Sequence, residues 1–196
     1  MMRRRLRGRA MRGHKTAFLP ALCVMVAAAG LLAAPPGAGR AGADDGTTTL
    51  MVYFGKEGLG AGDGACSAVA ALPRQIPKTP AVARAALQEL FRGPTPEERE
   101  AGYRSWFSRS TGAILKDVRI ADRTAYVDLH DLRQLIPGAT SSCGSAEFFA
   151  QVEATLKQFP TVERMVLAIE GQPRLFYDWM EMECDDTNDY CDPSRF

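Results

Sequence analysis

The chain has 196 residues, which is enough for one domain with a substantial core and leaves little for a second. Residues 1–43 contain eight of the 24 Lys and Arg and no Asp or Glu, so the remainder carries 16 basic against 23 acidic side chains, a net charge of −7. A surface of that sign gives no electrostatic basis for binding DNA or RNA, so we expect no nucleic-acid partner.

Residues 1–43 have the three parts of an export signal. Basic residues begin the segment, an apolar run covers 17–34, and Ala41-Gly42-Ala43 places small side chains where a signal peptidase needs them. The alternative is an uncleaved signal anchor, because the run is close to the lower limit of about 17 residues for a spanning helix. Either way we expect an exported, extracytoplasmic protein, secreted or periplasmic and envelope-associated, that meets the membrane only through this segment.

The first half of the remaining chain predicts a strand and two helices. The run 50–54 is continuously apolar, as in a strand buried on both faces. Residues 65–78 contain two prolines and are expected to be irregular. A threonine cap, an apolar stripe and a closing Gly-Pro pair predict a helix over 79–92, and an acidic first turn predicts a short helix over 96–100.

The second half predicts a hairpin, a long helix and two further strands. Apolar and polar residues alternate over 117–120 and 127–129, which indicates two paired strands with one wet face. Pro160 ends a helix, and alternation over 162–170 and then 175–179 predicts two strands joined by a tight turn. The buried face of the long helix is expected to hold apolar residues at three- and four-residue steps: Phe148, Phe149, Val152, Leu156 and Phe159.

This order of elements predicts an α/β (α+β) fold. We expect a single two-layer domain, with a mixed sheet of about five strands and two main helices packed on one face. The domain would occupy residues 44–183, and 184–196 would form an acidic C-terminal tail closed by a disulfide.

Four cysteines remain after residue 43, namely Cys66, Cys143, Cys184 and Cys191. An even number in an exported chain favours disulfides, and four cysteines allow three pairings that the sequence does not distinguish. We expect Cys184 to pair with Cys191 and Cys66 with Cys143. No two cysteines have zinc-ligand spacing, and the acidic tail lacks the glycine and glutamate of an EF-hand loop, so we expect no metal and no cofactor.

Few residues suggest chemistry. His130 lies near Asp128, but no Gly-x-Ser-x-Gly motif accompanies it, so we expect no catalytic residues and no enzyme. The aromatic group Tyr103, Trp106 and Phe107 has two interpretations. It forms either a binding platform for a carbohydrate or peptide, or a set of rings that pack over the edge of the sheet.

Three stretches resemble one known family. They are LQELFRGPT at 87–95, AYVDL at 125–129 and GSAEFFAQVEATLKQFPTVERMVLAIEG at 144–171, and together they are similar to the GerMN domain, named for sporulation and spore germination proteins. The resemblance covers roughly residues 47–180. It implies a small extracytoplasmic α/β domain, similar to the ring-building motifs of secretion machines, that acts by binding or assembly without catalytic residues.

The sequence therefore predicts a non-enzymatic domain of the bacterial cell envelope. Its partner would be an envelope protein or a cell-wall polymer, and the ring-building resemblance makes self-association worth testing. The alternative is a small-ligand or carbohydrate binder that uses the aromatic segment 103–107.

Overall fold

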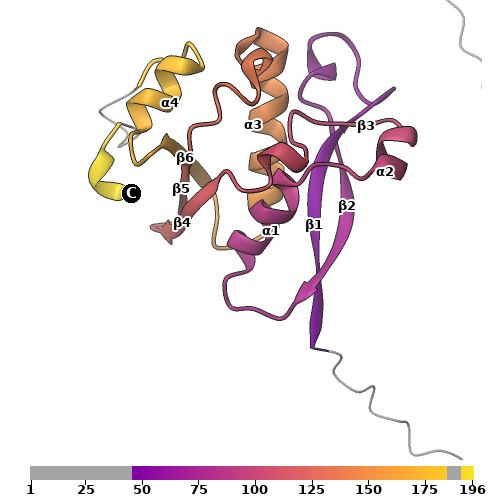
Figure 1. Cartoon of the computed structure of the whole chain (residues 1–196), viewed down its shortest axis with the longest axis horizontal. Coiled ribbons are helices and arrows are strands. Elements are labelled where there is room, and N and C mark those ends of the chain that lie inside the picture. The colour runs from indigo at the N-terminus through magenta and orange to yellow at the C-terminus, as the bar shows by residue number, and fades with distance from the viewer. Residues whose placement is uncertain (1–45, 185–190) are drawn as a thin grey trace, which may run out of the picture. The chain divides into compact units, whose positions relative to one another are not determined.

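Two small β-sheets lie on either side of a pair of helices in the computed structural model, which describes residues 46–184 and 191–196 (Figure 1). One sheet has the strand order β2-β1-β3 and is antiparallel. The other has the order β4-β5-β6, with β4 antiparallel and β6 parallel to β5. The strands are β1 (Thr47–Lys56), β2 (Val69–Pro77), β3 (Tyr103–Arg104), β4 (Leu115–Ala121), β5 (Thr124–Leu129) and β6 (Arg164–Ile169).

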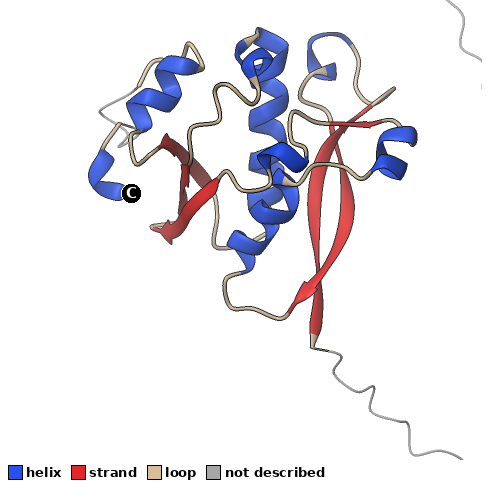
Figure 2. Cartoon of the chain, viewed as in Figure 1, coloured by secondary structure: helices blue, strands red, loops and turns tan. Residues whose placement is uncertain are grey.

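Four α-helices complete the described part of the chain: α1 (Val82–Phe91), α2 (Pro96–Glu100), α3 (Ser142–Lys157) and α4 (Pro173–Trp179). Helices α1 and α3 contact each other, and each contacts strands of both sheets. Figure 2 shows this arrangement of helices between two separate groups of strands. The expected α+β class is confirmed, but the single five-stranded sheet is wrong, because the two helices separate the strands into two sheets.

Strand β2 occupies a segment that was expected to be irregular. It pairs with β1 along its whole length, and among the described strands it has no second neighbour. Pro73 lies opposite Met51 and Pro77 opposite Thr47, four residues apart, so both rings lie on the same side of the strand. A proline has no N–H to donate and is tolerated on the outer side of an edge strand. The two prolines thus mark an edge strand, and they also leave fewer donors for another chain to pair with.

On its opposite edge β1 pairs with β3 only at Gly55 and Lys56, and side chains at the C-terminal end of α3 satisfy other backbone groups of that edge. The Thr155 hydroxyl accepts a hydrogen bond from the Tyr53 N–H at 3.2 Å. The Gln158 side-chain amide accepts from the Met51 N–H at 2.9 Å and donates to the Met51 carbonyl at 2.7 Å. These bonds replace those of a neighbouring strand, since buried backbone groups need partners. Thr155 is fully buried, which the apolar stripe of the helix did not predict.

Residues 173–179 form a helix, α4, so the strand predicted over 175–179 is wrong. The alternation of Leu175, Tyr177 and Trp179 suggested a strand, but the side chains that are buried follow helical spacing. Pro173, Phe176, Tyr177 and Met180 are the buried members, and a proline at the first turn suits a helix.

The β4–β5 hairpin is confirmed, but β5 has no wet face. All six of its residues are buried, because it is the central strand of its sheet and the end of the chain covers its second face. The ring of Phe196 meets Tyr126 edge-on, with centroids 5.7 Å apart, and the Arg119 guanidinium lies over the same tyrosine.

A chain of aromatic rings joins the helices in the core. Phe107 contacts Phe91 of α1 and Phe148 of α3, with ring centroids 4.8 and 5.3 Å apart, and Phe148 lies 5.8 Å from Phe176 of α4. All four side chains are fully buried. Aromatic pairs of this kind contribute beyond their buried area.

Gly93 allows the segment after α2 to reach this core. It has a φ of +73°, and a Cβ at this position would lie 2.2 Å from the Phe107 carbonyl oxygen. Thr111 secures the same approach, because its hydroxyl donates to the Phe91 carbonyl at 2.7 Å. The end of α1 and the segment 107–111 therefore pack backbone against backbone.

Replacing Gly93 with alanine should destabilise the fold by at least about 2 kcal/mol, since the change adds both a strained φ and a backbone clash. Gly64→Ala is the matched control, because a Cβ there meets nothing within 4 Å and its φ is not positive. Urea unfolding of the two variants measures the difference. Equal free energies of unfolding would show that the approach at Gly93 is unimportant.

Glu147 should make stability depend on pH in the sense opposite to most carboxylates. Burial raises its pKa above 4.5, although the charge of Arg104 opposes this, so the folded state holds the proton more tightly than the unfolded state. Its contribution to stability is then lost as the pH rises from 4.5 through the raised pKa.

Glu147→Gln keeps an acceptor for the Gln151 amide, which now lies 3.2 Å from a carboxylate oxygen. The melting temperature of this variant relative to the wild type should therefore rise between about pH 4 and about pH 7. A difference that stays constant over this range would contradict the account.

Candidate functional site

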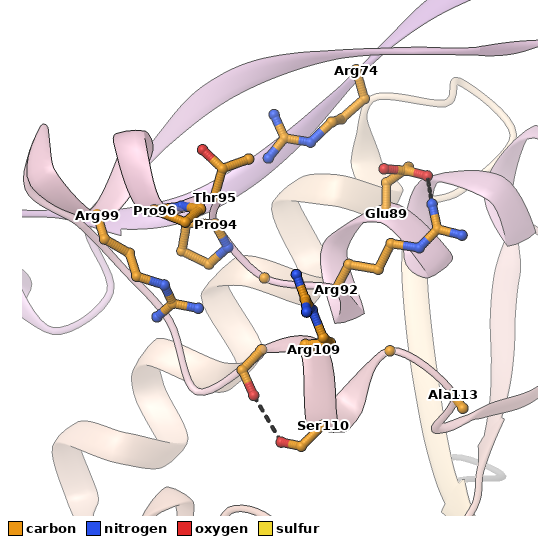
Figure 3. Close-up of a pocket in the computed structure, with 13 residues that line it drawn as sticks. Arg74, Glu89, Arg92, Pro94, Thr95, Pro96, Arg99, Arg109, Ser110 and Ala113 are labelled. Carbon is orange, nitrogen blue, oxygen red and sulfur yellow. Dashed lines mark hydrogen bonds and ion pairs between the residues drawn. The ribbon is translucent and has the colours of Figure 1, made fainter.

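A groove of about 840 Å³ lies where α1 ends (Figure 3). It is lined by the last turn of α1, the turn 93–96, part of α2 and the segment 108–113, and Arg74 reaches it from β2. The end of α1 and the segment 108–113 are separate in the sequence, and they meet here because Gly93 lets the segment 107–111 pack on the end of α1. The groove is thus a direct product of the core described above.

Four arginines line the groove, and two of them are already paired. Arg74 binds Glu98 through two bonds of 2.7 Å, and Arg92 pairs with Glu89. Among the residues that the structure describes, no carboxylate forms an ion pair with Arg99 or Arg109. Both of these side chains are exposed, and they flank the same space from different elements (Figure 3).

Arg99 is positioned by the cap of α2. The Thr95 hydroxyl accepts from the Glu98 N–H at 3.2 Å, and the Glu98 carboxylate accepts from the Thr95 N–H at 2.8 Å. This reciprocal cap fixes the first turn of the short helix. Burial raises the pKa of Glu98, but the bonds from Arg74 and Thr95 outweigh it and keep the pKa below its usual value. The carboxylate therefore stays charged and holds β2 to α2.

Arg109 is positioned by a hydroxyl that is fully buried. Thr111 accepts from the Ser108 N–H at 2.8 Å and donates to the Phe91 carbonyl, which fixes the tight turn that carries Arg109. The hydroxyls of Ser108 and Ser110 lie 2.8 Å apart at the same place. The groove therefore presents hydroxyl and guanidinium donors together.

This arrangement suits the binding of an anion. Guanidinium groups form strong, directional hydrogen bonds to carboxylates and phosphates. Among the described residues of the lining, Glu89 is the one carboxylate and is held by Arg92, so these residues offer no pair of free carboxylates for acid–base chemistry. Within residues 46–184 and 191–196, no group of three His, Cys, Asp or Glu side chains is placed to hold a metal ion.

A second charged cluster closes one end of the sheet that contains β5. Lys116 lies 3.1 Å from Asp128 and 3.0 Å from Glu170, which in turn lies 3.0 Å from His130. The ion pair with Glu170 raises the pKa of Lys116, and the same pair lowers that of Glu170. Asp128 also accepts from the Gly171 N–H at 2.6 Å. The partner of His130 is therefore Glu170, and the cluster acts as a structural tie for the turn after β6.

The aromatic residues singled out from the sequence lie outside the groove lining. Phe107 is fully buried, so its ring is not accessible to a ligand. Trp106 is half-buried and donates its ring N–H to the Gly144 carbonyl at 3.1 Å, and Tyr103 is half-buried with the Lys56 ammonium 3.8 Å from its ring centre. A ligand role for Tyr103 and Trp106 stays a prediction.

The structure joins Cys66 to Cys143 and Cys184 to Cys191, with Cα atoms 5.2 and 5.5 Å apart. The first bridge links the turn before β2 to the first turn of α3. The predicted export signal in 1–43 lies outside the described residues, as do 185–190 of the acidic tail. In the described part, no helix has the length and apolar character needed to cross a membrane.

Sequence reasoning did not find Arg99 and Arg109. They belong to no motif, and only the folded structure shows that no described carboxylate pairs with them. The available signal was compositional. Arg92 directly precedes the helix-ending Gly93, and three more arginines follow it, at positions 99, 104 and 109.

Comparison with known proteins identifies the family. Among solved structures, the tandem GerMN domains of the sporulation protein GerM from Bacillus subtilis match with 22% identity and a TM-score of 0.40, over 64% of this chain and 40% of that chain. This chain thus spans well under half of that structure's length. None of the curated proteins matches significantly. Residues 51–175, more than half of the chain, match the family model Germane, described as sporulation and spore germination, and the chain therefore belongs to this family.

Proposed function

We propose that this chain is a non-enzymatic, extracytoplasmic binding domain of the bacterial cell envelope, and that the arginine groove holds its partner. The observation that carries the proposal is the pair of exposed cations, Arg99 and Arg109, which have no carboxylate partner among the described residues. The export-signal pattern of 1–43 supports a location outside the cytoplasm. Membership of the sporulation and germination family is consistent with a role at the envelope.

The absence of catalysis is part of the proposal. The groove offers donors and positive charge, and its one carboxylate is bound by Arg92. A binding role needs only complementary charge and shape, whereas acid–base catalysis needs a group free to exchange protons.

The aromatic alternative has weaker support. Phe107 is buried, and a Cβ added at Gly138 would lie only 3.0 Å from the Trp106 ring, so this ring is packed against the loop before α3. A platform for a sugar would need at least one broad ring face that is free.

The test is recovery of envelope components with the full chain immobilised. The wild type should retain a component that the Arg99→Gln, Arg109→Gln double variant loses by at least about tenfold, because each charged hydrogen bond contributes roughly 1.5–3 kcal/mol. Arg164→Gln is the matched control, since Arg164 is exposed, lies on β6 outside the groove, and has no ion-pair partner within the described ranges.

The proposal stands only if retention of the envelope component depends on Arg99 and Arg109. Equal retention by the wild type and the double variant would place the binding surface elsewhere. Turnover of any envelope component by the purified chain would contradict the non-enzymatic role.

A further inference from the structure

We propose that the groove recognises phosphate groups along the backbone of an anionic polymer; this inference rests on the binding function proposed above. Of the four arginines in the lining, Arg74 and Arg92 are neutralised by Glu98 and Glu89. The positive charge left for a ligand is therefore that of Arg99 and Arg109.

Two serine hydroxyls add hydrogen-bond donors to the groove. The Ser108 and Ser110 hydroxyls share one hydrogen bond of 2.8 Å, which uses only one of their two hydroxyl protons. No described residue accepts the other hydroxyl proton, which can be donated into the groove that both residues line. A ligand that fits must consequently supply several acceptor oxygens.

The directions of the hydrogen-bond donors distinguish a phosphate from a carboxylate. A carboxylate places its two oxygens in one plane and is best taken by a single guanidinium, as Glu98 is by Arg74 with two bonds of 2.7 Å. Arg99 comes from α2 and Arg109 from the turn after β3, and they flank the groove from different elements (Figure 3). The tetrahedral oxygens of a phosphate can accept from two such directions at once.

The groove lining has few apolar side chains. Those that it has are Pro94, Pro96 and Ala113, and no described residue of the lining is aromatic. Bases and sugars are usually held by stacking on rings, so neither would have a platform here. The groove is therefore suited to the charged backbone of a polymer. The net charge of −7 outside residues 1–43 repels a polyanion from the rest of the surface, so we expect contact to be confined to the groove.

The test uses the full chain and three probes: inorganic polyphosphate, poly-L-glutamate of equal charge and vesicles containing phosphatidylglycerol. Polyphosphate should bind, and Arg99→Gln or Arg109→Gln should each weaken it by about tenfold, whereas Arg164→Gln should change it less than about twofold. With about two phosphates contacted, the logarithm of the affinity should fall with the logarithm of salt concentration at a slope of roughly −1 to −2. Unchanged melting temperatures would show that the variants are folded.

The other outcomes separate this inference from the binding function. Poly-L-glutamate that binds as tightly as polyphosphate, with the same sensitivity to Arg99 and Arg109, would overturn the phosphate assignment and leave the groove as an acidic-protein site. Binding to vesicles without binding to polyphosphate would replace the polymer with a lipid headgroup. If no probe responds to the double variant, the inference fails, and the envelope experiment decides separately whether the binding function stands.

Discussion

The close approach of Gly93 to the backbone of Phe107 is the constraint on which the rest of the structure depends. No side chain fits between them, because even a Cβ would lie 2.2 Å from the Phe107 carbonyl oxygen. This approach puts the Phe107 ring between Phe91 and Phe148 in the core and puts Arg109 beside the end of α1. Core packing and groove geometry therefore share one cause: stability and binding are coupled through a single glycine.

Local chemistry allowed much of this fold to be predicted. The Gly93-Pro94 helix end, the acidic short helix and the long helix closed by Pro160 are all determined by neighbours in the sequence. One failure came where position in the sheet decides the structure, and another where an alternating pattern overlapped a helical one. Prolines mark a break in a central strand but are acceptable on the outer side of β2, and the alternation over 175–179 concealed the helical spacing of Phe176 and Met180.

The candidate site was harder to predict than the fold. Phe107 suggested a ligand platform because exposed and buried aromatics look the same in a sequence, and only its contacts with Phe91 and Phe148 place it in the core. Arg99 and Arg109 were missed for the opposite reason. Their importance depends on having no carboxylate partner among the described residues, and this property follows from the fold, in which Glu98 and Glu89 pair with the other two arginines of the groove.

The most direct test of the account is to map the binding surface by following backbone amide NMR signals during titration of the full chain with inorganic polyphosphate. The account predicts the largest shifts at the amides of Gly93, Ser110 and Gly112, which line the groove. The largest shifts around Arg164 on β6, or around the Lys116–Glu170 cluster, would contradict it.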